Sequence, residues 1–267
     1  GLDTAEVLDR KQSDGGVGSD APEDALSAEY DALVEATPTT LGDAEPAFSH
    51  VATALERDRH VVLGNKGPVA QRYQAIQRLA AQSEGEVRYE ATIGGPLPVF
   101  STIRDVGRER VHGIRGVFNG LANFILSRMS NEGLSYEHVH AEAQDLGLAE
   151  VDSTIDVEGT DTALTCAILA NTLADGDVEY TIDDVDIEGI TDIPGSALEL
   201  ARENGLTVKL LGEVRDDQLR VAPRTVPEHS TLAVSGAQTV VELDIEDAGQ
   251  VNITRSKIGR ASCRERG

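Results

Sequence analysis

The chain has 267 residues, 40% of them hydrophobic, and 47 acidic against 23 basic residues give it a formal net charge of −24. This size suffices for one large domain or two small ones with a buried core, and no stretch approaches the ~20 apolar residues of a membrane span. The acidic residues are spread along the chain. This favours a solvated acidic shell, as halophilic proteins carry, over a surface for a basic partner. Because such a surface repels phosphate backbones, nucleic acid is excluded as a partner.

The start of the chain and its cysteines bear on location. Residues 1–20 contain neither the basic region nor the apolar run of a signal peptide. Cys166 and Cys263 have no partners at the spacing of a disulfide framework or a zinc cluster. Together these features predict a protein of the reducing cytoplasm, without a membrane partner.

In chain order, the first hundred residues alternate between strand-like and helical patterns. Apolar strands are expected at residues 31–35, 60–63 and 87–91, with helices between them at 48–55 and 68–79. Such alternation with short connections predicts a parallel α/β sheet.

A nucleotide-binding sheet of this kind opens with a strand and a Gly-rich phosphate turn. The nearest candidate is Gly15-Gly16-Val17-Gly18, but acidic residues surround it and no apolar strand precedes it. We interpret it as a loop and expect the chain to begin after the dinucleotide fingerprint. Residues 1–93 are therefore predicted to be an incomplete Rossmann-type nucleotide-binding domain.

From Gly94 the pattern changes. Helical spacing is seen at 119–129, 135–146, 160–173 and 195–204, and strand-like segments are expected at 185–190, 206–214, 219–223, 240–245 and 251–254. This predicts an α+β region with a largely antiparallel sheet over residues 94–255. The last segment, 256–267, holds four basic residues and one acid, which reverses the charge bias of the chain, and we interpret it as a non-native tail.

One candidate for chemistry is Lys66, in the segment Gly64-Asn65-Lys66-Gly67-Pro68 after a buried strand. Open α/β sheets bind ligands beyond the carboxyl ends of their strands, and a desolvated lysine can transfer protons near neutral pH. The alternative is a lysine in a surface loop, which is weaker in a chain that has only four lysines.

Two further segments combine glycines with carboxylates. Residues 90–98 (EATIGGPLP) place an acid before a glycine turn, which suits either a hard cation or an ordinary tight turn. The second segment has Gly147 at a helix end, then Glu150 and Asp152, and then Asp156 and Asp161. These acids suit helix capping and recognition of a substrate ammonium group equally well.

Taken together, these segments resemble the homoserine dehydrogenase family in their order and spacing, over about residues 1–255. The matching segments are Asn65-Lys66, 36–39 (ATPT), 90–95 (EATIGG), 116–126 (GVFNGLANFIL), 143–150 (AQDLGLAE) and 159–163 (GTDTA).

The resemblance implies an enzyme that interconverts L-homoserine and L-aspartate 4-semialdehyde with NADP or NAD, in threonine, methionine and isoleucine biosynthesis. By position, Lys66 faces both cofactor and substrate and is the candidate for proton transfer. Thr37 and Gly147 correspond to cofactor contacts, and Glu150 and Asp161 to the carboxylates that bind the substrate.

The resemblance also implies a sodium site and a homodimer. The sodium ligands would be Glu90 together with Ile93, Gly95 and Leu97, the last three mostly through backbone carbonyls. Residues 94–255 would form the catalytic and dimerisation domain.

One position departs from the family. The family has a second lysine, usually assigned as the proton donor, one helical turn after the aspartate, and here that position is Thr165. A threonine hydroxyl can bind the carbonyl oxygen but is no acid at neutral pH, and loss of a positioned acid typically costs about 10²–10⁴ in rate. Either Lys66 supplies the proton alone, or the chain is a catalytically impaired, amino-acid-binding remnant. A third alternative is a related dehydrogenase with another small substrate.

Overall fold

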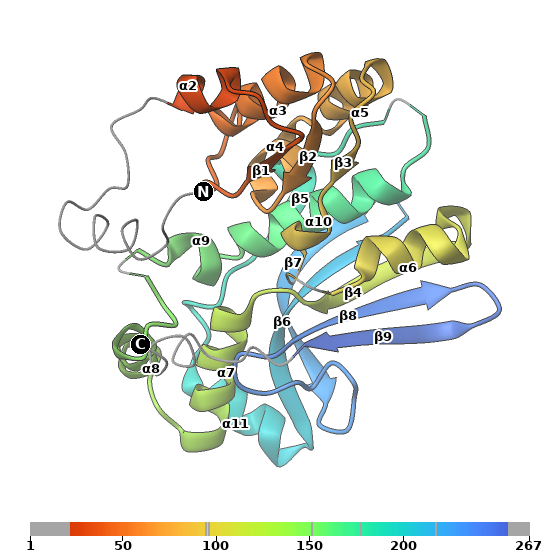
Figure 1. Cartoon of the computed structure of the whole chain (residues 1–267). Helices are drawn as coiled ribbons and strands as arrows, with labels where there is room; N and C mark the ends of the chain where they lie inside the picture. Colours follow the sequence, from red (N-terminus) through yellow and green to blue (C-terminus); the bar gives the residue numbers. More distant parts are fainter. Residues whose placement is uncertain are drawn as a thin grey trace, which may run out of the picture.

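The computed structural model describes residues 22–93, 95, 97–150, 152–176, 178–216 and 218–255. The Gly-rich segment 15–18 and the tail 256–267 lie outside these residues. The described residues form two layers, each built on one sheet, and the layers lie one above the other in Figure 1.

The first layer contains three short parallel strands in the order β1-β2-β3. Its strands are β1 (Ala32–Glu35), β2 (His60–Leu63) and β3 (Val87–Arg88), and its helices are α2 (Pro22–Ser27), α3 (Ala47–Glu56), α4 (Lys66–Gln71) and α5 (Tyr73–Gln82). Val61 and Leu63 alternate along β2 and are buried, as is Leu55 of α3. The predicted parallel α/β arrangement is confirmed. The third predicted strand is shorter, since residues 90–92 form the 3₁₀ turn η1 (Glu90–Thr92).

The second sheet has six strands in the order β5-β7-β6-β4-β8-β9 and is antiparallel except for the β5–β7 pair. Its strands are β4 (Val111–Val117), β5 (Val185–Ile187), β6 (Leu206–Arg215), β7 (Gln218–Pro227), β8 (Thr239–Ile245) and β9 (Gly249–Arg255). The predicted largely antiparallel sheet is therefore confirmed. The central strand β4 was not predicted.

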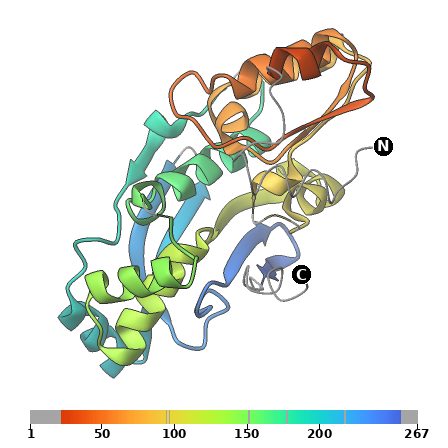
Figure 2. The ribbon, with the colours of Figure 1, turned by 60° about the vertical axis from the view of Figure 1, so that its left-hand side comes forward.

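Helices connect and cover this sheet. They are α6 (Val99–Val106), η2 (Arg108–Arg110), α7 (Gly120–Glu132), α8 (Tyr136–Asp145), α9 (Thr154–Val157), α10 (Thr160–Leu173), η3 (Ile182–Asp184) and α11 (Gly195–Glu203). Helices α7, α10 and α11 pack against β6, and α10 also packs against α4 of the first layer. Figure 2 shows α10 lying between the two layers. None of the described helices is long and apolar enough to cross a membrane.

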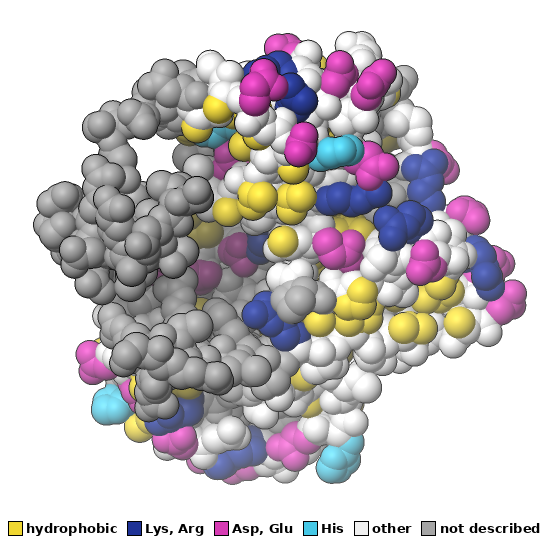
Figure 3. Space-filling view, in the orientation of Figure 1, with side chains coloured by type: hydrophobic (Ala, Val, Ile, Leu, Met, Phe, Trp, Pro, Cys, Tyr) yellow, Lys and Arg dark blue, Asp and Glu magenta, His cyan; other side chains and the backbone are white. Residues whose placement is uncertain are grey.

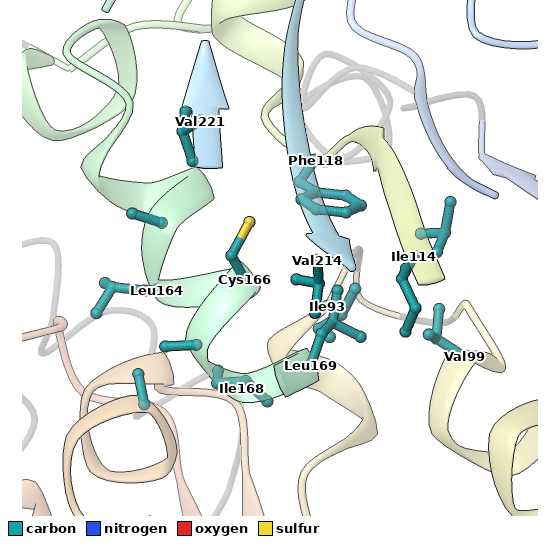
Figure 4. Packing of buried hydrophobic residues seen from close by; sticks show 14 of the residues in the cluster. Ile93, Val99, Ile114, Phe118, Leu164, Cys166, Ile168, Leu169, Val214 and Val221 are labelled. Atoms are coloured by element: carbon teal, nitrogen blue, oxygen red, sulfur yellow. The ribbon is translucent and has the colours of Figure 1, made fainter. Parts of the chain in front are cut away.

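The core around α10 depends on one glycine. Figure 4 shows Cys166 of α10 with its sulfur directed toward Phe118 and the neighbouring strand. A Cβ on Gly212 of β6 would lie 2.5 Å from the Phe118 ring and 2.8 Å from Cys166 Sγ, so only glycine leaves room for both side chains. Burial raises the pKa of the Cys166 thiol to about 12, which makes it an unreactive packing residue.

Part of the second sheet is open to solvent. Charged residues of its strands line a hollow of about 350 Å³ there and pair across strands, as in Arg115–Glu242 at 2.5 Å and Arg224–Glu213 at 3.1 Å. On the face seen in Figure 3, Asp and Glu side chains are dispersed over several elements.

Candidate active site

The loops after β1 and β2 are tied together at the carboxyl edge of the parallel sheet. Asn65 is the N-cap of α4, and its Oδ1 accepts from Gly67 N at 2.9 Å. Its Nδ2 donates to Thr37 Oγ1 and to Pro38 O, both at 3.3 Å. This network fixes the start of α4, and Lys66 is the first residue of that helix.

Lys66 reaches from the first layer to helix α10. Its Nζ lies 2.6 Å from Asp161 Oδ1 and 3.4 Å from Asp161 O, in the first turn of α10. The side chains are 16% and 25% exposed respectively, so the ion pair is partly shielded from solvent but accessible to a small ligand. The structure thus brings Lys66 and Asp161 into contact, and their roles toward cofactor and substrate stay predictions.

A second contact to Asp161 was not predicted. Asn119, the N-cap of α7, accepts from Ala122 N through Oδ1. Its Nδ2 donates to Asp161 Oδ2 at 3.0 Å and to Asp156 Oδ1 at 2.6 Å. One buried amide thus holds two carboxylates beside the Lys66 ammonium. An asparagine directly before a helical pattern signals a cap, but nothing in its spacing indicates the bonds to the two acids.

These groups line a cavity of about 270 Å³ between the two layers. Its walls include Lys66, Gly95, Asn119, Asp156, Asp161 and Arg255. A Cβ on Gly95, whose φ is +71°, would lie 2.8 Å from Arg255 Nη1, so the turn passes close to this guanidinium. The cavity therefore brings together an ammonium, a guanidinium and two carboxylates.

Thr37 lies next to this edge but not in the cavity lining. Its amide and hydroxyl donate to Glu35 Oε1 at 2.8 and 2.5 Å, and His50 Nδ1 lies 2.7 Å from Glu35 Oε2. Burial opposes ionisation of Glu35, but the hydrogen bonds from Thr37 and His50 hold its pKa below the usual value. Glu35 thus acts as a fixed acceptor that orients the loop after β1.

Gly147 and Glu150 are outside the cavity lining, although their neighbour Leu148 is part of it. Gly147 ends α8 with a φ of +66°, and its amide donates to Gln144 O at 2.9 Å. Glu150 is exposed, and its backbone carbonyl accepts from Gln144 Nε2 at 3.2 Å. Their cofactor and substrate contacts stay predictions.

Thr165 follows Asp161 by one helical turn, as predicted, but it is 1% exposed and does not line the cavity. Its hydroxyl donates to Asp161 O at 3.2 Å within α10. Threonine back-bonding of this kind satisfies the hydroxyl inside the helix. A catalytic role for Thr165 stays a prediction.

The predicted sodium ligands surround the turn before α6. Glu90 Oε1 accepts from Phe100 N at 3.0 Å and Ser101 N at 3.4 Å, so this carboxylate caps α6. Ile93 and Leu97 have buried side chains, which leaves only their backbone carbonyls for a cation. Among the described residues, no three His, Cys, Asp or Glu side chains are grouped as for a metal. The sodium site stays a prediction.

Comparison with known proteins identifies the family. The family model for homoserine dehydrogenase matches residues 98–263. The chain belongs to the homoserine dehydrogenase family. It is 38% identical over 222 residues to the homoserine dehydrogenase of Methanocaldococcus jannaschii, covering 83% of this chain and 66% of the relative. It is 34% identical over 237 residues to the NAD(+)-dependent homoserine dehydrogenase of Pseudomonas canavaninivorans, covering 86% and 66%. The chain thus spans just under two thirds of these two homoserine dehydrogenases.

Solved structures of homoserine dehydrogenases share the fold. The putative homoserine dehydrogenase of Archaeoglobus fulgidus superposes with a TM-score of 0.87 at 36% identity, covering 97% of this chain and 80% of that one. The enzyme of Thiobacillus denitrificans gives 0.84 at 32% identity, covering 94% and 59%. The Rossmann-type α/β layer joined to a mostly antiparallel sheet is therefore the fold of this family. These comparisons lend no support to a non-catalytic remnant.

Proposed function

We propose that this protein interconverts L-homoserine and L-aspartate 4-semialdehyde with NAD or NADP, within threonine, methionine and isoleucine biosynthesis. The observation that carries the proposal is the 2.6 Å contact between Lys66 Nζ and the Asp161 carboxylate, in a chain of the homoserine dehydrogenase family. The contact lies just beyond the carboxyl end of β2, where open α/β sheets bind their ligands.

The residues after β1 and β2 fit a nicotinamide cofactor. Asn65 binds Thr37 and caps the helix that begins at Lys66, beside the cavity, and we assign Thr37, Lys66 and Gly147 to cofactor contacts. When bound, the cofactor would exchange a hydride with the carbon that carries the aldehyde or alcohol oxygen. NAD and NADP would be distinguished by kcat/KM measured with each.

Charges in the cavity suit an amino acid. Asp156 and Asp161, held by Asn119, would attract the substrate ammonium group, and Arg255 would attract a carboxylate. We assign Glu150 to the same ammonium group. In the reducing direction the Lys66 ammonium would donate a proton to the carbonyl oxygen, and in the oxidising direction the amine would take it back.

Because the Thr165 hydroxyl already bonds Asp161 O, we assign the proton to Lys66 alone. The test is steady-state reduction of aspartate semialdehyde by four proteins: the parent, Lys66→Ala, Thr165→Lys and the double variant. We expect Lys66→Ala to lose at least about 10²-fold in kcat in both backgrounds. Thr165→Lys should leave turnover unchanged, or raise it if the new ammonium reaches the oxygen.

Gln82→Ala, at the exposed end of α5, is the matched control and should keep parental kinetics. Near-parental turnover in Lys66→Ala would contradict the assignment of the proton. Loss of turnover in a Thr165→Lys protein that keeps the parental circular dichroism spectrum and melting temperature would show that the threonine has its own role. A panel of small aldehydes tests the alternative of a related dehydrogenase with another substrate.

We also propose that the protein forms a homodimer. The open, charge-paired area of the second sheet, with Arg115, Glu213, Arg224 and Glu242, offers a surface on which two copies could exchange ion pairs. Light scattering coupled to gel filtration measures the mass directly, and a monomer at micromolar concentration would contradict it.

A further inference from the structure

Lys209 is a buried lysine outside the cavity. It lies in β6 and is 2% exposed. Its Nζ donates to Asn123 Oδ1 at 2.9 Å and to Ser127 Oγ at 3.2 Å, both on α7. Neither partner is charged, so these bonds offset only part of the cost of removing an ammonium from water. Burial accordingly lowers the pKa of Lys209 to about 8. A methionine would fill the same space at lower cost, so packing alone does not account for the ammonium.

Asn123 connects Lys209 to a loop. This amide is fully buried, and its Nδ2 donates to Val234 O at 3.2 Å and to Gln238 O at 3.0 Å. The loop joins β7 to β8. A protonated lysine can only donate, so it compels the Asn123 oxygen to face it and the nitrogen to face the two carbonyls. An apolar neighbour would not impose that orientation.

The same loop forms part of the catalytic cavity. Ala237 and Thr239 line it together with Gly120, and a Cβ on Gly120 would lie 2.9 Å from Ala237 O. One turn before Asn123 on α7, Asn119 holds Asp156 and Asp161. The side chains of α7 therefore position both the carboxylates and the loop opposite them.

We infer that Lys209 is a positioning residue: by orienting the Asn123 amide, it fixes the 234–238 loop against the first turns of α7 and so shapes the substrate cavity. The contacts that carry this inference do not depend on the chemistry of the cavity. Only its kinetic consequence rests on the proposed function.

Hydrogen exchange on the full chain tests the inference. The reporters are the backbone amides of Leu232, Ala233, Ser235 and Gln238, which donate hydrogen bonds within residues 230–238. In Lys209→Met we expect them to exchange about tenfold faster, as for the loss of one buried hydrogen bond, while β6 and β7 keep parental rates.

Ser127→Ala is the matched control, because it removes a hydroxyl from the same ammonium and leaves Asn123 in place. Its loop should exchange at the parental rate.

Asn123→Asp gives a second test that keeps Lys209. Its carboxylate still accepts from the lysine but turns an oxygen toward Val234 O and Gln238 O, so the loop should again exchange faster. Parental loop exchange in folded Lys209→Met would overturn the inference. If Lys209→Met does not fold, parental loop exchange in Asn123→Asp would overturn it.

In an active enzyme, Lys209→Met should raise KM for the amino-acid substrate by about threefold to tenfold, with a smaller change in kcat. Lys209→Arg, which keeps a donor, should restore part of this loss. If the parent does not turn over homoserine, the proposed function fails while the exchange result still decides the role of Lys209. Faster loop exchange with parental KM would limit Lys209 to structure and overturn its part in shaping the cavity.

Discussion

At the level of single residues, Asn119 both caps α7 and holds two carboxylates, and one substitution distinguishes these two roles. Aspartate caps a helix as well as asparagine does, so Asn119→Asp keeps α7. It also places a third carboxylate within hydrogen-bond distance of Asp156 and Asp161. Because three like charges then share one site, we expect kcat/KM to fall at least about tenfold and the substrate-site carboxylates to titrate at higher pH. Steady-state kinetics against pH measures both.

The control is Ser135→Asp, which changes the N-cap of α8 outside the cavity lining. It should leave the pH profile as in the parent. An unchanged profile in Asn119→Asp would show that its amide does not govern the two acids.

Burial of Lys209 predicts how the free energy of unfolding changes with pH. Its folded-state pKa, about 8, lies below the unfolded value of 10.5. The unfolded chain therefore binds more protons between these values, and the contribution of Lys209 to the unfolding free energy rises with pH from about 8 to 10.5, by about 1.4 kcal/mol per pH unit at most. Urea unfolding of the parent and Lys209→Met, compared at pH 7.5 and 9.5, isolates this component. A difference between the two proteins that does not change with pH would contradict it.

At the level of secondary-structure elements, β4 depends on glycine. A Cβ on Gly116 would lie 2.2 Å from Val240 O of the neighbouring strand and 2.5 Å from the Phe118 ring. Because one of these contacts is with backbone, Gly116→Ala should destabilise the protein by about 3 kcal/mol or prevent folding. Gly195→Ala, at the start of α11 with open space around it, should be neutral. Thermal melting distinguishes the two, and equal melting temperatures would contradict the packing argument.

Two glycines explain why the sequence did not predict β4. Gly113 and Gly116 interrupt the apolar pattern of β4, so strand propensity is low where close approach of neighbouring strands is required. In contrast, β2 is a continuous apolar run followed by a capped helix. This pattern predicted that Lys66 lies beyond the carboxyl end of a parallel strand.

The same limit applies to the site, because its contacts join segments that are far apart in the sequence. The pairing of Lys66 with Asp161 spans 95 residues, and the family resemblance assigned both residues to substrate contacts without predicting an ion pair between them. The bonds from Asn119 to the two acids depend on the packing of α7 against α9 and α10, which no local pattern encodes. Glu150, assigned from the same resemblance, is exposed, since its segment follows α8 at the surface.

For the whole molecule, the balance of charge is the dominant feature. Among the described residues, several ion pairs lie at the surface, as Arg88–Glu86 and Arg108–Asp175 do, and such pairs contribute at most about 1 kcal/mol each. With 47 acids against 23 basic residues, most carboxylates have no cation to pair with. The folded state therefore concentrates negative charge that the expanded chain separates.

This self-repulsion predicts that stability rises with salt. The Debye length falls from about 10 Å at 0.1 M to about 3 Å at 1 M, which screens all but adjacent carboxylates. We expect the unfolding free energy to rise by about 3 kcal/mol between 0.1 and 1 M KCl, or roughly 6–12 °C in melting temperature for a chain of this size. Circular dichroism during urea or thermal unfolding follows the change. Sucrose is the control, because it stabilises compact states by exclusion but screens no charge; it should give a steady rise with no saturation near 1 M. Stability that is flat or falls with KCl would show that the acidic surface does not set a salt requirement, and that the shell has another role.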